Sequence, residues 1–242
     1  MRKMIIAGIC GIMIMGVCGC GQNNSQQQQV VDDTTAQVIT EAQTTEKKDM
    51  TQVSYKGSSI PMEYSTDGNI EVVKEYIEDE GSYLDRYIIV KNNSSKNLGV
   101  NTNTAVFDSN GAMVETENSS CSALGPGETG FIEESFSKEN EIAKINTTIS
   151  TNENSDRIIA LSDFSYEQTV SDKKLILQCQ YNGPASEMGV QIRALFFKDG
   201  EVVGHDWESE DFIPGIPLSI QLESWDEFDS AEVFVKGYGY SK

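Results

Sequence analysis

Histidine and basic residues are scarce in this sequence. Its 242 residues include one histidine, and 18 Lys and Arg stand against 38 Asp and Glu, for a net charge of −20. Zinc sites are built mainly from Cys and His, and no cluster of these residues has zinc-site spacing here. Nucleic-acid phosphates are bound by Lys and Arg, so the charge balance argues against a nucleic acid partner. Two interpretations of the acidity remain, a solvated surface or attraction for cations and basic partners.

Long hydrophobic runs are absent except at the start of the chain. Met4 to Val17 is apolar and uncharged, and it follows Arg2 and Lys3. A helix that crosses a bilayer needs about 20 apolar residues, and this run is shorter. A basic start, a short apolar run and small residues after it are typical of a secretory signal.

The residues after this run resemble the lipobox of bacterial lipoproteins. Cys20 has Val17 three positions before it and Gly19 directly before it, whereas Cys18 directly follows the branched Val17. The resemblance implies that residues 1–19 are a signal peptide and that Cys20 carries a diacylglycerol. Several acyl chains would anchor the protein stably, on the extracellular side of the cell membrane.

A polar segment follows the lipidated cysteine. Gln26 to Gln29 is a glutamine run, and no apolar period persists through the Thr-rich residues after it. Such a composition buries too little apolar surface to offset chain entropy. We therefore expect residues 20–52 to be a disordered tether that spans roughly 30 Å as a flexible coil.

An internal repeat begins after the tether. Matching anchors recur at spacings of 88 to 90 residues, which predicts two copies, residues 53–154 and residues 155–242. The anchor pairs are Leu98–Val100 with Met188–Val190, Asn110 and Gly111 with Asp199 and Gly200, Pro126 and Gly127 with Pro214 and Gly215, and Ala143, Ile145 and Thr147 with Ala231, Val233 and Val235.

Each copy has the pattern of an all-β domain. Strand-length apolar runs recur every 10 to 15 residues with turn signals between them, and Asp199–Gly200 has the chemistry of a tight hairpin. We therefore predict two tandem antiparallel immunoglobulin-like β-sandwich domains. In the second copy the expected strands are Ile158–Gln168, Lys173–Tyr181, Val190–Lys198, Glu201–Trp207, Leu218–Glu223 and Glu232–Tyr238.

The same segments are similar to the FxLYD-type domain of bacterial lipoproteins, over about residues 69–238. The resemblance implies an immunoglobulin-like sandwich outside the membrane and brings no catalytic residues with it. The residues that carry it are Tyr87–Val90, Asn92, Asn93, Thr104–Asp108, Asn110, Gly111 and Leu124–Glu128, and more loosely Asn182, Phe196, Phe197, Asp199, Gly200, Pro214 and Gly215.

Two cysteines remain beyond the lipidated one. Cys121 and Cys179 fall in different predicted domains, so we expect two reduced thiols although a secreted chain permits disulfides. Cys179 alternates with Leu175, Leu177 and Tyr181, which predicts a buried structural cysteine.

No catalytic motif accompanies the single histidine. His205 stands beside Asp206 and Trp207, without a Gly-x-Ser-x-Gly nucleophile motif nearby, and we interpret it as a lone surface histidine. Any acidic sandwich offers paired carboxylates for glycoside hydrolysis, so that alternative stays open. We expect no enzymatic activity.

Two groups of residues are candidate binding sites. Calcium prefers about six to eight oxygen ligands, and an acidic group in the second domain offers them, but without EF-hand spacing we favour a solvated rim and expect no cofactor. Strand parity also predicts an outward apolar patch, which either binds a partner or packs against the first domain or the tryptophans. The acidic group is Asp206, Glu208, Glu210 and Asp211, with Asp226, Glu227 and Asp229; the patch is Ile176, Leu195, Phe197 and Phe234.

Taken together, the sequence predicts a membrane-anchored extracytoplasmic lipoprotein. Its paired domains would bind or scaffold a protein or cell-envelope partner without catalysis. One alternative is a cation-dependent or carboxylate-based envelope hydrolase, and another is a structural spacer with no ligand. The oligomeric state stays open.

Overall fold

The computed structural model describes residues 46–55, 58–154 and 161–238, which are almost entirely β-strand. The predicted signal peptide and the predicted lipidation site, Cys20, lie outside the described residues. All of these described residues belong to one compact unit. Within the described ranges no helix is long and apolar enough to span a bilayer.

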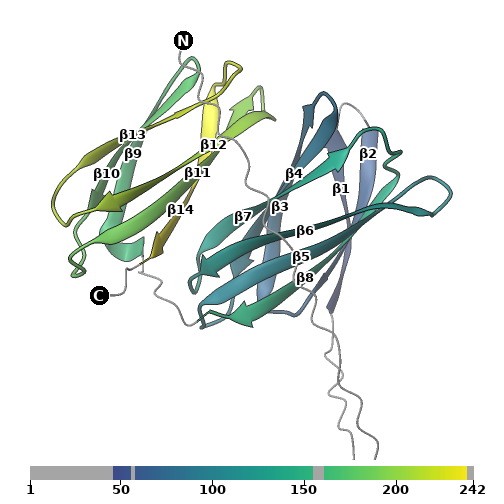
Figure 1. Cartoon of the computed structure of the whole chain (residues 1–242), viewed down its shortest axis with the longest axis horizontal. Helices are drawn as coiled ribbons and strands as arrows, with labels where there is room; N and C mark the ends of the chain where they lie inside the picture. The colour runs from purple at the N-terminus through teal and green to yellow at the C-terminus, as the bar shows by residue number, and fades with distance from the viewer. Residues whose placement is uncertain (1–45, 56–57, 155–160, 239–242) are drawn as a thin grey trace, which may run out of the picture. The chain divides into compact units, whose positions relative to one another are not determined.

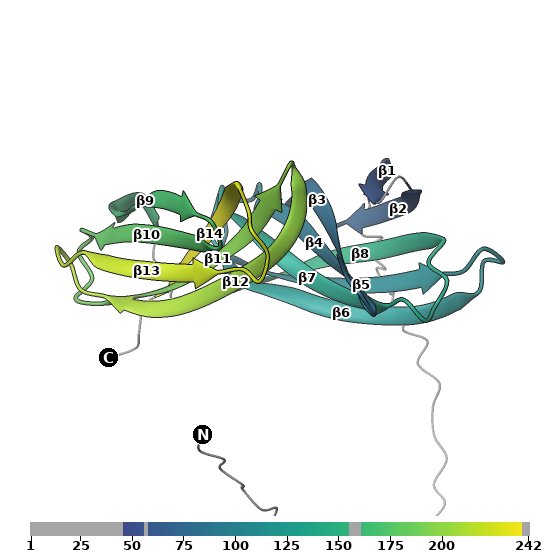
Figure 2. The same cartoon turned by 90° about the horizontal axis from the view of Figure 1, so that it is seen from above.

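The first sandwich packs a five-stranded sheet, in the order β1-β2-β8-β5-β6, against a three-stranded sheet, β3-β4-β7. Neighbouring strands are antiparallel except β2 and β8, which run parallel. In Figures 1 and 2, β1 and β2 form the outer part of the larger sheet. The strands are β1 (Glu46–Tyr55), β2 (Ser58–Thr66), β3 (Ile70–Glu80), β4 (Tyr83–Asn92), β5 (Leu98–Phe107), β6 (Met113–Leu124), β7 (Thr129–Ser137) and β8 (Lys144–Glu153).

The second sandwich has two three-stranded antiparallel sheets, β13-β10-β9 and β12-β11-β14. All six strands overlap the predicted ranges, and the fold class is confirmed as immunoglobulin-like. The predicted first strand starts in residues 158–160, outside the described part of the chain, and β9 begins at Phe164, while β12 continues past the predicted end at Trp207 to Phe212. The strands are β9 (Phe164–Ser171), β10 (Lys174–Tyr181), β11 (Met188–Lys198), β12 (Glu201–Phe212), β13 (Leu218–Glu223) and β14 (Ser230–Tyr238), preceded by a short 3₁₀ turn, η1 (Leu161–Asp163).

The two sandwiches share a topology of six strands, as the repeat predicts, and the first sandwich adds β1 and β2 to it. The sheet β3-β4-β7 corresponds to β9-β10-β13, and β6-β5-β8 corresponds to β12-β11-β14. Gly127 and Gly215 both have a φ of 77°, a left-handed conformation that favours glycine. Each donates its N–H to the last residue of the central strand, Asn92 or Tyr181. The turn chemistry of the two copies is therefore equivalent.

The predicted end of the tether is wrong. Gln52 was the expected boundary, but β1 begins at Glu46 and pairs with β2 along its length. The Lys, Thr and Gln composition of this segment has a low apolar content, which hides the strand. A partner strand supplies its backbone hydrogen bonds, so an edge strand forms here without a strong apolar pattern.

Each sandwich has its own apolar core. The thiols of Cys121 and Cys179 pack in different cores, so they do not pair with each other. Cys179 is buried, as its strand position predicts, and burial raises the pKa of its thiol to about 11.

Candidate binding site at the junction of the two sandwiches

An apolar cluster joins the two sandwiches. It contains Tyr87, Ile89 and Phe131 from β4 and β7, and Leu195, Phe197, Val202 and Phe234 from β11, β12 and β14. We call these seven residues the interface cluster. The rings of Phe131 and Phe234 meet edge to face with centroids 5.3 Å apart, and those of Tyr76 and Phe197 are 5.0 Å apart. Such aromatic pairs stabilise by about 0.5–1.5 kcal/mol beyond their buried area.

The sequence of β4 reflects this double burial. Tyr87, Ile88, Ile89 and Val90 are all buried in succession, because Ile88 and Val90 face the core of the first sandwich while Tyr87 and Ile89 face the second sandwich. A strand covered on both faces has a continuous apolar run instead of alternation.

The predicted partner-binding patch is corrected by this arrangement. Leu195, Phe197 and Phe234 are buried against the first sandwich, so they do not form an exposed patch for a partner. Ile176 lies on β10 in the other sheet of the second sandwich and is not part of the cluster. The sequence left open whether these residues bind a partner or pack within the protein, and the structure shows that they pack against the first sandwich.

A chain of polar side chains borders the interface cluster. The hydroxyl of Tyr87 donates to Glu78 Oε2 at 2.7 Å and lies 2.8 Å from His205 Nδ1. On its other side, His205 Nε2 lies 3.4 Å from Glu133 Oε1. His205 therefore contacts Tyr87 and Glu133 of the first sandwich at the junction, and its interpretation as a lone surface histidine is wrong.

Glu78 lies at the buried end of this row of polar side chains, and its burial controls its pKa. Glu78 is 6% exposed. Desolvation raises its pKa to about 7, the hydrogen bond from Tyr87 opposes this, and the charges of Glu80 and Asp85 add to the rise. Burial likewise raises the pKa of Tyr87, so its hydroxyl keeps its proton at neutral pH.

An open cleft of about 700 Å³ lies beside His205, and we call it the acidic cleft. Two of its aromatic side chains face solvent, Tyr83 at 53% exposure and Trp225 at 96%. No Lys or Arg is among the described residues that line it. The lining residues are Glu80, Tyr83, Asp85 and Ser135 from the first sandwich and Val203, Gly204, His205, Asp206, Glu223, Ser224, Trp225 and Asp226 from the second.

The predicted acidic group does not come together as a metal site. Of its four principal members, Asp206 alone lines the cleft, and its carboxylate accepts the backbone N–H of Glu223 at 2.9 Å. Glu208, Glu210 and Asp211 follow along β12, where Asp211 has the opposite strand parity. Within the ranges that the structure describes, no three His, Cys, Asp or Glu residues are placed to hold a metal ion.

The structure reveals cleft residues that the sequence did not single out. Glu80, Tyr83 and Asp85 come from the β3–β4 hairpin of the first sandwich, more than a hundred residues before Trp225. The sequence signal for the aromatic residues was their polar surroundings. A Trp or Tyr flanked by acids and serines has no apolar period that would place it in a core.

Comparisons with known proteins give limited information. No family model and no curated protein match the chain. Among solved structures it is similar to red sea bream transglutaminase, with 9% identity over 70% of this chain and 29% of that chain and a TM-score of 0.25. It is also similar to the calcium binding domain CBD12 of CALX1.1, with 14% identity over 67% of this chain and 79% of that chain and a TM-score of 0.21. The chain thus spans less than a third of the transglutaminase, and similarities at these scores carry no inference about activity or ligand.

Proposed function

We propose that this protein is a lipid-anchored extracytoplasmic binding protein whose acidic cleft receives a positively charged segment of a protein partner. The observation that carries the proposal is the lining of the cleft, in which carboxylates from both sandwiches surround exposed aromatic rings. The tether and the acyl chains on Cys20 would present this cleft outside the membrane. The resemblance to the FxLYD-type domains of bacterial lipoproteins supports this location outside the membrane.

The charge of the cleft selects the kind of partner. Glu223 already pairs with Lys174 at 3.2 Å, and Asp206 is hydrogen-bonded to backbone. Among the described residues Asp85 and Asp226 form no ion pair, so a Lys or Arg side chain of a partner can approach them. Opposite charges also accelerate association, because the field steers a basic partner toward the cleft.

The exposed aromatic residues strengthen the same preference. The indole of Trp225 is almost fully exposed, so its faces are accessible to a partner. Lys and Arg bind the faces of Trp and Tyr through cation–π contacts that contribute about 0.5–2 kcal/mol. An aromatic wall in an acidic recess therefore favours binding over the hydrolase alternative, which requires no exposed tryptophan.

The two tryptophans of the chain provide a matched experiment. Trp225 lines the cleft, whereas Trp207 is 54% exposed on β12 and does not line it. In the full chain carrying Trp207→Phe, the fluorescence of Trp225 should shift to shorter wavelength when a blocked Lys-Gly-Lys-Gly-Lys peptide is added. In the Trp225→Phe protein, the fluorescence of Trp207 should stay unchanged.

Affinity measurements distinguish binding at the acidic cleft from nonspecific attraction by the negative charge of the whole protein. Trp225→Ala should weaken peptide binding about 2- to 30-fold, from the cation–π range. Asp85→Asn with Asp226→Asn should weaken it further, while Glu167→Gln with Glu187→Gln, an equal charge change at exposed positions, should not. Equal losses in the two double variants would show nonspecific attraction and would refute the proposal.

A further inference from the structure

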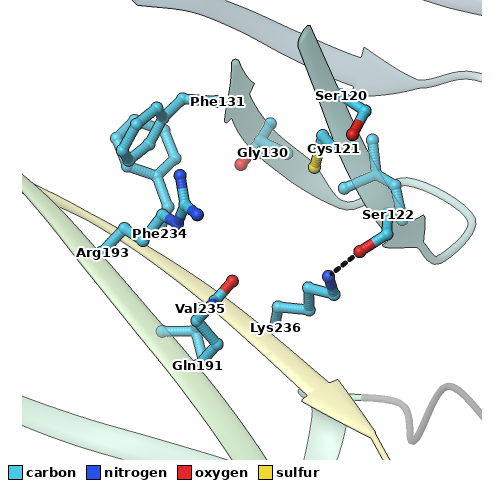
Figure 3. A pocket seen from close by; sticks show the side chains of 12 residues that line it. Ser120, Cys121, Ser122, Gly130, Phe131, Gln191, Arg193, Phe234, Val235 and Lys236 are labelled. Carbon is cyan, nitrogen blue, oxygen red and sulfur yellow. Dashed lines mark hydrogen bonds between the residues drawn. The ribbon is translucent and has the colours of Figure 1, made fainter. Parts of the chain in front are cut away.

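A second recess at the junction has the opposite charge. It is a small cavity of about 60 Å³, and we call it the basic cavity. Figure 3 shows its side chains, with Arg193 and Lys236 entering from the second sandwich and Cys121 and Ser122 from the first. The lining residues are Ser120, Cys121, Ser122, Leu124, Thr129, Gly130 and Phe131, with Gln191, Arg193, Phe234, Val235 and Lys236.

Two cations are held at this cavity by neutral partners. The guanidinium carbon of Arg193 lies 5.1 Å from the ring centroid of Phe131. Lys236 Nζ donates to the hydroxyl of Ser122 at 2.8 Å. In the described part of the chain no ion pair joins either cation to a carboxylate.

This arrangement is unusual for so acidic a protein. The chain has 38 acidic residues and 18 basic ones, yet two basic residues and no acidic residue are among the described residues that line the cavity. Glu128 acts electrostatically on Cys121, and its carboxylate accepts the N–H of Gly125 at 2.9 Å within its own turn. Among the described residues, therefore, no carboxylate pairs with either positive charge.

The pKa values of Lys236 and Cys121 reflect burial and the charges around them. Burial lowers the pKa of Lys236, the Cys121 thiol acts against this, and the charge of Arg193 lowers it further. Burial raises the pKa of Cys121, and the two cations oppose that rise. Two like charges in a partly buried recess cost free energy unless an anion lies between them.

We propose that the basic cavity binds a phosphate group. Two cations match the charge of about −1.5 to −2 that a phosphate group carries at neutral pH. Arginine presents a planar fork of donors that suits phosphate oxygens, and Ser120, Ser122 and Thr129 add hydroxyl groups around it. The volume is several times the roughly 10–15 Å³ that one water molecule needs, so a small anion fits in it.

The cavity also explains a glycine on β7. A Cβ atom added at Gly130 would lie 2.9 Å from the sulfur of Cys121 and 3.3 Å from Leu124 Cδ1. Glycine therefore leaves the thiol in place at the cavity wall. The thiol then serves as a reporter, because an anion bound beside it would block its access to reagents.

Thiol protection tests the proposal without any substitution. The full chain is treated with neutral iodoacetamide, and peptide mapping by mass spectrometry follows Cys121 and, as an internal control, the buried Cys179. Inorganic phosphate at about ten times its Kd should slow alkylation of Cys121 about tenfold and leave Cys179 unchanged. Acetate or chloride at equal ionic strength should protect Cys121 far less. Equal protection by all three anions would overturn the proposal.

Two variants identify the groups responsible. Arg193→Gln with Lys236→Gln should abolish phosphate protection, whereas Lys198→Gln, an exposed lysine on the same strand as Arg193, should retain it. Undiminished protection in the double variant would overturn the assignment. Glycerol phosphate gives the last comparison, because protection by this ester indicates a phosphoryl group of a larger ligand and protection by inorganic phosphate alone indicates the free ion. These experiments do not involve the acidic cleft, so the proposed function can fail without affecting their outcome.

Discussion

The clearest stability prediction concerns Arg86, a charged residue in the core of the first sandwich. Its side chain is fully buried and pairs with Glu75 and with Glu134, whose Oε2 lies 2.8 Å from Arg86 Nη1. The same guanidinium donates to Thr147 Oγ1 at 2.7 Å and to the Tyr64 hydroxyl at 3.1 Å. The attraction of these partners outweighs desolvation and raises the pKa of Arg86, so it stays charged.

Replacing Arg86 by Leu should destabilise the protein strongly. The substitution leaves two carboxylates, Glu75 at 2% side-chain exposure and Glu134 at 0%, without their cation. Removing one partner of a buried ion pair costs about 3–5 kcal/mol. For a cooperative unit of roughly 150–250 residues, each kcal/mol lowers Tm by about 2–4 °C, so Tm should fall by roughly 6–20 °C. Urea denaturation followed by circular dichroism measures the free energy of unfolding directly.

The second sandwich supplies the control for this experiment. Glu134 corresponds to Leu222 when both are counted from the equivalent turn glycines, and Arg86 corresponds to Leu175 when both are counted from the strand residues that those glycines bond, Asn92 and Tyr181; Leu175 and Leu222 also pair across strands. The second copy thus builds the same core position from apolar residues.

A variant that copies this solution should recover most of the loss. Arg86→Leu, Glu134→Leu and Glu75→Gln together remove the cation and both buried carboxylates, and replacing buried ion pairs by apolar residues is often neutral or stabilising. A loss below about 1 kcal/mol for Arg86→Leu alone would refute the reasoning. So would a triple variant no more stable than the single one.

Three further predictions concern the junction and the anchor. Glu78 contributes stability below its unfolded pKa near 4.5, and this contribution is lost as pH rises through its folded pKa of about 7. Glu78→Gln should therefore stabilise the protein by up to about 3 kcal/mol at pH 8 and change its stability little at pH 4. Parallel curves of stability against pH for the two proteins would contradict this. Leu195→Ala, at a fully buried position of the interface cluster, should cost about 2–5 kcal/mol by urea denaturation, and a loss within experimental error would mean that the two sandwiches do not pack there. Cys20→Ala should abolish incorporation of labelled palmitate, and continued labelling would transfer the proposed lipid to another cysteine.

The repeat and most strands could be predicted because their signals are local. Turn residues such as Gly127 and Gly215 require a left-handed backbone, and inward residues alternate on each strand. Alternation also gave a clue to the buried ion pair, since Arg86 shares its parity with Leu84, Ile88 and Val90. Parity places a residue on a face, but it does not identify the partners that make burial of a charge tolerable.

The sites were less predictable because they depend on what covers each face. Parity correctly put Leu195, Phe197 and Phe234 on a face away from their own core, and it could not reveal that Tyr87, Ile89 and Phe131 cover them. Both recesses combine residues from the two copies, which are distant in sequence. No local motif records such a combination, whereas a motif within one copy would have been visible.

The opposite charges of the two recesses follow from one structural fact, the packing of the interface cluster. Cations from β11 and β14 enter one recess, and carboxylates from β12, β13 and the β3–β4 hairpin border the other, on strands that the cluster holds together. Loosening the cluster by Leu195→Ala should therefore weaken peptide binding at the acidic cleft and phosphate protection of Cys121 together. Trp225→Ala should impair the first alone, and Arg193→Gln with Lys236→Gln the second alone. If Leu195→Ala left both intact while lowering stability, binding at the two recesses would not depend on the packing of the interface cluster.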